Sequence, residues 1–403
     1  MRILVLLLLA TLGVLPAQER DYGFDGTISE PVLRNYLSRA VTFMDGLTDG
    51  GDLADNVRML TACGAKYLGR GIYLWAGEGS LPAKLKAAQG RIAKLHVVDP
   101  QMIAEACIFE IVSDEVEKLL VPAWAFTAQN LPVEDRHFRY SDMIYADGKG
   151  QKWRGNGNAQ VPDVSRPETR LWFYFLARTY IDLGCEAIHY GQVQLMDRND
   201  RDHTHWRAVF EQARTYAHTN ARRHLLLCNA HVPGGGFVTD GKLLLDFHAF
   251  PLRIKEVIEK PKDGVLEMGY SDGLYGRSRG GVTPSGWSCA HLPYLVEFDN
   301  YGASRSPGEA KMGSVWVWGW DEITWFSQLE HDARDAWLQY AWTWVRTHDA
   351  DGYLQMPICR MITKAPNGQR LYRANNPCAA MPDGYSQEDT IRKIWQADAK
   401  ATR

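Results

Sequence analysis

Short apolar runs that end in polar and aromatic residues recur along this chain, and helix-like segments separate several of them. Eight runs have this character: Lys66–Trp75, Ile103–Val112, Glu186–Gln194, His224–His231, Lys242–Phe250, Val265–Tyr270, Tyr294–Tyr301 and Gly313–Trp320. Eight strands that alternate with helices indicate an α/β fold of the (β/α)8 (TIM) barrel class. In that fold the active site lies where the carboxyl ends of the strands converge.

The segments around these runs complete the predicted layout. Ser29–Asp45 and Asp52–Cys63 have helical patterns, and both are expected to close the bottom of the barrel. Residues 113–166 form a long loop insertion after strand 2, and a loop of this length with many aromatic residues is expected to lean over the barrel mouth. Pro366-Asn367-Gly368 predicts a small hairpin, followed by a short helix. The predicted organisation is a signal peptide over residues 1–17, N-terminal helices over 18–63, the catalytic barrel over 64–347 and a C-terminal extension over 348–403.

The first residues have the pattern of a secretory signal peptide. Arg2 supplies the positive charge, Ile3–Leu15 the apolar stretch, and Pro16-Ala17 a small-residue cleavage site. The apolar stretch is shorter than the about 20 residues that span a bilayer. We therefore expect a secreted or periplasmic protein that has no membrane segment after cleavage.

Charge and aromatic content narrow the possible partners. The net charge is -3, and positive charges are not grouped into a basic block, so a nucleic-acid partner is not expected. The chain has 14 tryptophans and 18 tyrosines, many of them at predicted strand or loop ends. Aromatic rings at a barrel mouth are suited to stacking on sugars, so we expect a carbohydrate substrate.

Carboxylates within apolar strands are the candidates for catalysis. Alternation along a strand places Glu297 and Asp299 on one face, and Asp246 and His248 together on another strand. A buried carboxylate is unfavourable unless it is paired or used in chemistry. Glycoside hydrolysis requires two carboxyls across the scissile bond. We therefore predict Glu297, Asp246 and Asp299 as catalytic residues, with Glu110 and Glu267 in reserve.

Further polar and aromatic residues near the predicted strand ends are candidates for binding sugar hydroxyls and ring faces. They are Gln192, Asn229, His231, His248, Tyr270, Trp318, Trp320 and Asp321.

Together, the barrel pattern, the export signal and these strand ends resemble the (β/α)8 glycoside hydrolases. In their largest retaining clan an Asn-Glu pair ends strand 4 and a nucleophilic Glu ends strand 7. Glu297 matches the second element, whereas the predicted fourth strand has Asn229 followed by Ala230 instead of Glu. The resemblance implies a secreted hydrolase of poly- or oligosaccharides whose general acid differs from that of the clan.

Two other functions remain open at this stage. His189, His231 and His248 follow successive predicted strands and could bind a metal with Asp246 and Glu297, as in a metal-dependent barrel hydrolase or isomerase. The missing Glu after Asn229 would also fit a carbohydrate-binding barrel without catalysis. The expected glycoside hydrolase needs no cofactor and no metal. The sequence leaves open the sugar, the linkage, endo or exo action, the stereochemistry and the oligomeric state.

Overall fold

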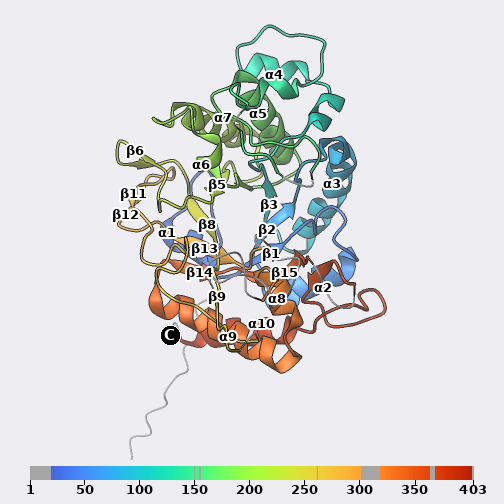
Figure 1. The fold of residues 1–403 in the computed structure, drawn as a ribbon, viewed down its shortest axis with the longest axis vertical. Coiled ribbons are helices and arrows are strands. Elements are labelled where there is room, and N and C mark those ends of the chain that lie inside the picture. Colours follow the sequence, from blue (N-terminus) through green and yellow to red (C-terminus); the bar gives the residue numbers. More distant parts are fainter. Residues whose placement is uncertain are drawn as a thin grey trace, which may run out of the picture.

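A curled, largely parallel β-sheet lies at the centre of the structure, a computed structural model that describes residues 20–401 except 149, 154–155, 261, 301–317 and 364–367 (Figure 1). Its strand order is β14-β13-β8-β5-β4-β3-β2-β1-β15-β16. The strands are β1 (Ala40–Phe43), β2 (Tyr67–Ile72), β3 (Ile103–Cys107), β4 (Ala187–His189), β5 (Leu227–Ala230), β8 (Phe247–Pro251), β13 (Tyr294–Glu297), β14 (Gly352–Leu354), β15 (Met356–Met361) and β16 (Leu371–Arg373).

The two ends of this sheet meet at residues 352–361. β14 pairs in parallel with β13, and β15 pairs in parallel with β1. Only Gln355 separates β14 from β15; its backbone N–H donates to Val296 and its side chain donates to the carbonyl of Val41. The strands accordingly follow one another around a ring in Figure 1, with helices outside them.

Helices of the described chain surround the sheet. They are α1 (Glu30–Leu37), α2 (Leu53–Cys63), α3 (Leu81–Val98), α4 (Ala123–Ala128), α5 (Pro167–Asp182), α6 (Val193–Met196), α7 (Thr204–Asn220), α8 (Glu322–Gln328), α9 (His331–His348) and α10 (Glu388–Ala401). Local signals in the sequence fix some of their ends. Asp52 caps α2 by accepting from the N–H of Asp55 at 2.8 Å, and Gly64 ends it in the left-handed conformation.

α1 lies across the amino end of the sheet interior instead of on its outer side. Tyr36 and Leu37 of this helix are buried against inward-facing residues such as Tyr67, Phe247 and Leu295. Because these side chains alternate with outward-facing ones along each strand, they define which positions point inward. The predicted closure of the bottom is confirmed for α1, whereas α2 packs outside beside α10 through the pair between Arg58 and Glu388.

Small strands lie in two excursions from the sheet. β6 (Val238–Thr239) and β7 (Lys242–Leu243) precede β8, and β11 (Gly281–Val282) and β12 (Ser288–Cys289) precede β13. These four form one small sheet. β9 (Lys255–Glu256) and β10 (Gly264–Val265) pair as a separate ribbon. The excursion between β8 and β13 returns to the carboxyl edge of the main sheet, where it contributes to the site described below.

Six predicted strands lie at their expected places in the main sheet, and one does not. Val265–Tyr270 is wrong as a main strand, because only Gly264–Val265 is extended and it pairs with β9. Most of Gly313–Trp320 lies outside the described residues, and its last three residues form a turn. The sheet instead includes β1, which we expected to continue the first helix, and β14–β15, which lie beyond residue 347. The predicted pairing of the C-terminal hairpin is confirmed between β15 and β16.

Candidate active site

A layer of buried polar side chains crosses the inside of the sheet above the apolar residues that α1 covers. Glu105 on β3 accepts hydrogen bonds from the hydroxyl of Tyr67, from the backbone N–H of Arg70 at 2.8 Å and from Asn229 Nδ2 at 2.7 Å. Asn229 Oδ1 lies 2.7 Å from Nδ1 of His189. Burial raises the pKa of Glu105, although the donors around it act in the opposite direction. This layer supports the groups that lie nearer the carboxyl edge.

Glu297, at the end of β13, is the central carboxylate of that edge. Both of its oxygens contact the guanidinium of Arg70, with Nε at 2.8 Å from Oε2. Arg360 Nη1 lies 3.8 Å from Oε2, and the hydroxyl of Thr42 donates to the same oxygen at 3.3 Å. Burial alone would raise the pKa of Glu297, but Arg70 and Arg360 outweigh it and hold the pKa below its ordinary value. Glu297 is therefore ionised at neutral pH.

The backbone of β2 is distorted where it presents Arg70. The parallel register between β2 and β3 shifts after Leu68, and Arg70 has a φ of 60°, in the left-handed region. Its neighbours are both glycines: a Cβ on Gly69 would overlap the side chain of Gln355, and one on Gly71 would lie 2.5 Å from Leu47. A non-glycine residue in this conformation is strained by about 1–3 kcal/mol, and such strain concentrates at functional sites.

A chain of alternating charges continues from Glu297 toward solvent. Arg360 Nη2 lies 3.4 Å from Asp299, which also accepts from Arg253 Nη1 at 3.1 Å. Arg253 pairs in turn with Asp272, and His231 Nε2 lies 3.5 Å from Asp272. Burial alone would raise the pKa of Asp272, but the contacts with His231 and Arg253 lower it well below its usual range. Asp299 is 17% exposed, compared with 3% for Glu297, so the second carboxylate is the more accessible one.

Glu322, at the start of α8, holds the ends of two strands beneath this chain of charges. It accepts from the N–H of Ile254 and from the N–H of Asp299, both at 2.9 Å. The side chain is fully buried, and burial raises its pKa to about 8, with a further contribution from Asp299. A neutral carboxyl at this position fixes the backbone that carries Asp299.

The structure separates Asp246 from the other two catalytic candidates. Asp246 accepts from Arg214 on α7 and from the N–H of Cys228, both at 2.8 Å. Since Phe247 and Ala249 face the sheet interior, Asp246 and His248 face the surrounding helices. Asp246 therefore does not lie across a cleft from Glu297; it joins α7 to the sheet. Burial lowers the pKa of His248 to about 4, so this imidazole is neutral at neutral pH.

Two of the predicted binding residues belong to the site. Asn229 lies inside the sheet beside Glu105, and His231 lies beside Asp272 at the end of the series of charged side chains. Gln192 donates to Glu110 through its backbone N–H and its Nε2, both at 2.8 Å. This arrangement fixes the turn after β4 and requires Gly191, where a Cβ would overlap a Glu110 oxygen. The half-buried Tyr270 lies in the loop between β10 and β11, two residues from Asp272.

Trp318, Trp320 and Asp321 precede α8. Trp318 is 2% exposed and stacks on Trp325 with ring centroids 4.6 Å apart, so this ring belongs to the core. Trp320 is half-buried and packs against the same core. Asp321 caps α8 by accepting from the N–H of Thr324 at 2.8 Å, and burial raises its pKa to about 6. The ring stacking and the cap explain why these residue types follow one another here.

Most of the residues that surround Glu297 and Asp299 were not predicted from the sequence. Arg70, Arg253 and Arg360 were not candidates, and neither were Tyr67, Glu105 and Asp272. One signal was present in the sequence: Gly69-Arg70-Gly71 interrupts an apolar strand, and glycines in a strand interior indicate a bulge or a close approach. Asp272 lies two residues after the predicted strand Val265–Tyr270 but was not a candidate, and only the fold of the loop between β8 and β13 places it beside Arg253.

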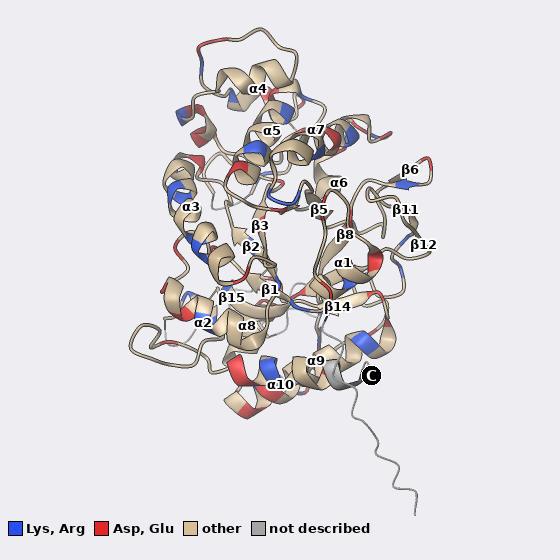
Figure 2. Cartoon of the chain, turned by 180° about the vertical axis from the view of Figure 1, so that it is seen from behind, with Lys and Arg blue, Asp and Glu red and all other residues tan. Residues whose placement is uncertain are grey.

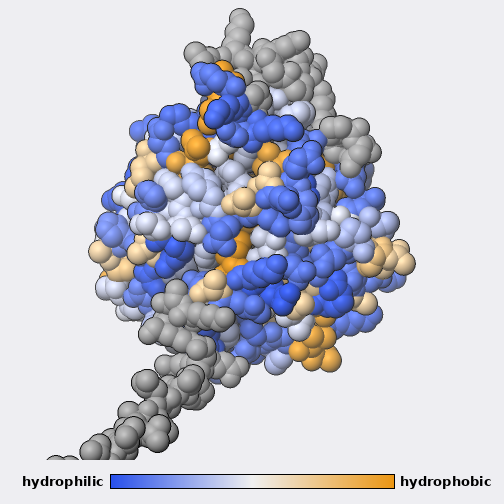
Figure 3. Space-filling model, turned by 90° about the horizontal axis from the view of Figure 1, so that it is seen from below, coloured by the Kyte–Doolittle hydropathy of each residue, from blue (hydrophilic) through white to orange (hydrophobic). Residues whose placement is uncertain are grey.

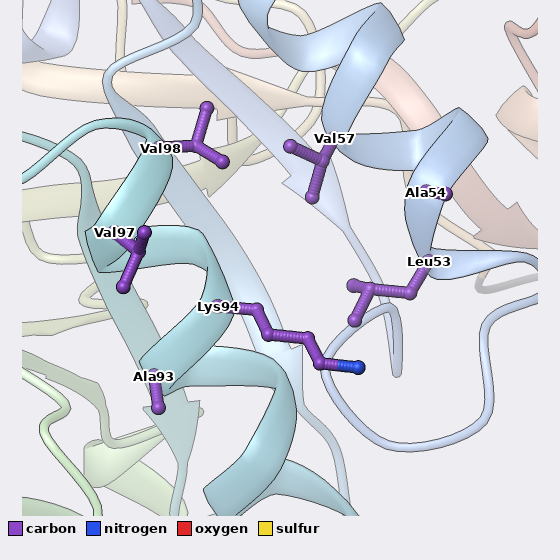
Figure 4. A pocket seen from close by; sticks show the side chains of 7 residues that line it. All are labelled: Leu53, Ala54, Val57, Ala93, Lys94, Val97 and Val98. Carbon is purple, nitrogen blue, oxygen red and sulfur yellow. The ribbon is translucent and has the colours of Figure 1, made fainter.

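One surface groove lies outside this site. An apolar groove of about 590 Å³ lies between α2 and α3, where Leu53 and Val57 face Val97 and Val98 (Figure 4). This groove lies on the outer surface, away from the series of charged side chains that begins at Glu297. The face of the molecule seen in Figure 3 is mostly hydrophilic, with scattered apolar residues. Within the described part of the chain, no group of three or more His, Cys, Asp or Glu side chains is arranged to hold a metal ion.

Comparisons with known proteins find similarity in structure but not in sequence. No protein-family model matches the chain, and no curated protein matches its sequence. Among solved structures, the cyclic α-maltosyl-(1→6)-maltose hydrolase from Arthrobacter globiformis, in complex with maltose, is similar with a TM-score of 0.49 and 13% sequence identity, over 91% of this chain and 84% of that chain. A similarity at this level leaves the function of the chain to be argued from its own residues.

Proposed function

We propose that this protein is a secreted glycoside hydrolase that cleaves a poly- or oligosaccharide at the carboxyl edge of a (β/α)8 barrel. The observation that carries the proposal is the pair of carboxylates on one guanidinium: Arg360 contacts Glu297 at 3.8 Å and Asp299 at 3.4 Å. Glycosidases use two carboxyls about 5–9.5 Å apart, and two groups that share one guanidinium have a separation of this order.

The environments of the two carboxylates suit different roles. Glu297 is buried and held ionised by Arg70, as a nucleophile or base must be. Asp299 lies closer to solvent, where the leaving group of a bound substrate can reach it. Arg253 and Glu322 hold Asp299 from two sides, so its position is fixed before substrate binds. In this proposal Asp299 takes the place of the general acid that the sequence lacks after Asn229.

The surface is consistent with a neutral substrate. Lys and Arg positions (blue) and Asp and Glu positions (red) are interspersed along the outer helices in Figure 2. No helix in the described ranges is long and apolar enough to cross a membrane. Export through the segment over residues 1–17 remains part of the proposal.

One observation favours a second function, carbohydrate binding without turnover. Arg70 occupies both oxygens of Glu297, and a carboxylate held in this way is also what a purely structural ion pair would present. Release of reducing ends from a bound oligosaccharide distinguishes the two functions.

Asp299→Asn and Asp246→Asn test the proposed roles side by side. With a panel of xylan, glucan, mannan and starch oligosaccharides, we expect Asp299→Asn to lower turnover by about 10²–10⁴-fold, the usual contribution of a general acid. Asp246→Asn removes a buried partner of Arg214 and is expected to lower stability but to keep the turnover per folded molecule. Full activity of Asp299→Asn, or an equal loss in folded Asp246→Asn, would contradict this assignment.

A further inference from the structure

We propose that Tyr73, Trp75 and Trp153 form a binding subsite for one neutral pyranose ring beside the carboxylates; this inference rests on the proposed function. Tyr73 and Trp75 follow the end of β2, and Trp153 belongs to the long loop between β3 and α5. All three side chains are half-buried, whereas Phe109 beneath them is buried. The cluster therefore offers aromatic surface to solvent at the carboxyl edge of the sheet.

The rings meet edge to face, which leaves ring surface uncovered. Trp75 and Trp153 have centroids 5.1 Å apart and an interplanar angle of 67°, and Trp75 meets Phe109 at 5.2 Å and 65°. A tilted pair cannot offer one long flat strip, so it suits a single ring and not two consecutive sugars. A pyranose with equatorial hydroxyls has a flat apolar face that matches one indole.

Contacts connect this cluster to the catalytic carboxylate. Tyr73 meets Phe109 with centroids 4.8 Å apart, and the guanidinium carbon of Arg70 lies 5.4 Å from the centre of the Phe109 ring. Arg70 is the partner of Glu297. Phe109 thus contacts both Trp75 and Arg70. The next sugar of an oligosaccharide bound on Trp75 can therefore approach Glu297.

Hydrogen bonds fix the loop ring before any ligand arrives. Trp153 Nε1 donates to the carbonyl of Glu110 at 3.0 Å, and its backbone N–H donates to Ala159 at 3.1 Å. Gln160 pairs with Val112 at the end of β3 and so holds the loop against the sheet. A ring that is already ordered loses little conformational freedom on binding.

Among the described residues, the two charged side chains that contact the cluster, Arg70 and Asp45, already have partners, which favours a neutral sugar over an acidic one. Arg70 is paired with Glu297. Asp45, which accepts from the N–H of Tyr73 at 3.1 Å, is paired with Lys84 at 2.6 Å. A uronic acid would need a free cation beside the rings, whereas a neutral pyranose needs only the ring faces and the hydroxyl of Tyr73.

Calorimetric titration with xylohexaose, cellohexaose, mannohexaose and maltohexaose tests the subsite on the whole protein. We expect at least one hexaose to bind the wild type, and Trp75→Ala and Trp153→Ala each to weaken that binding about tenfold or more. Trp75→Phe keeps an aromatic ring and is expected to stay within about threefold of the wild type. The matched control is Trp344→Ala, which removes a half-buried ring that stacks on His348 on α9.

The outcomes separate this subsite from the proposed function. Hexaose binding that is unchanged in both Trp75→Ala and Trp153→Ala, or no binding of any hexaose to the wild type, overturns the subsite. Binding that depends on the indoles without release of reducing ends refutes hydrolysis and leaves the subsite standing. Melting curves identify any variant that fails to fold; if Trp153→Ala does, the comparison of Trp75→Ala with Trp75→Phe decides.

Discussion

Glu297→Ala is expected to lower the free energy of unfolding by about 3–5 kcal/mol, and Arg70→Ala by a similar amount, because each leaves a buried charge without its partner. The Glu297 side chain is buried at 3% exposure, the Arg70 side chain is 13% exposed, and their contact is bidentate. The double replacement Arg70→Met with Glu297→Met is expected to cost less than the sum of the single changes, since it removes both charges together. Guanidinium unfolding curves measure each difference.

Arg58 and Glu388 provide a matched control for this cycle. They also form a bidentate pair, with Arg58 Nη1 and Nη2 donating to Glu388 at 2.9 and 2.7 Å, but Arg58 is 49% exposed. Because Glu388 is only 6% exposed, Arg58→Ala is expected to cost less than Glu297→Ala but more than the about 0–1 kcal/mol of a fully exposed pair. If Glu297→Ala costs no more than this control, the buried pair does not organise the site as described.

The contribution of Glu322 to stability is expected to fall as the pH rises from about 4.5 to about 8. Burial raises the pKa of this carboxyl to about 8 from an ordinary 4.5. Between those values the unfolded chain has lost the proton that the folded protein keeps, so each pH unit removes up to about 1.4 kcal/mol. The contribution is complete below pH 4.5 and is lost as the pH passes through 8.

Glu322→Gln should remove that slope. The amide can accept only one of the two N–H groups that the carboxyl serves, so the variant is expected to be less stable than the wild type near pH 5. The difference should shrink, and then reverse, as the pH approaches 9. Glu267→Gln, at an exposed position between β10 and β11, should instead follow the wild-type curve. Parallel curves for the wild type and Glu322→Gln would contradict the neutral carboxyl.

The sequence predicts the class of fold better than it predicts the number and the bounds of the strands. Alternating apolar runs and helices locate six strands of the main sheet. β1 is missed because Ala40–Phe43 is buried at every position and continues the apolar pattern of α1, and a short apolar run does not distinguish strand from helix. β14 is missed, and β15 is predicted only as a hairpin strand and not as part of the main sheet, because Gln355 and Pro357 interrupt the apolar pattern.

Site prediction depends on which way each strand faces. Glu297 could be singled out because a carboxylate in an apolar strand needs a partner. Asp246 satisfies the same rule, but its partner is Arg214 on an outer helix, and only the register between β5 and β8 determines this. Asn229 lies on the fifth parallel strand and not the fourth, because β1 adds a strand before it. The three arginines of the site were not predicted, because their role depends on contacts between residues far apart in the sequence, such as Arg70 with Glu297.

Turnover of Glu297→Gln tests most directly whether Glu297 is the ionised carboxylate on which sugar hydrolysis depends. Reducing-end release should be measured on the hexaose that binds best, at a temperature where melting curves show the variant folded. We predict that the wild type hydrolyses the hexaose and that Glu297→Gln loses at least about a thousandfold in turnover, while the hexaose still binds within about tenfold. Turnover by Glu297→Gln within a few fold of the wild type, or a wild type that binds the sugar without cleaving it, would contradict the claim.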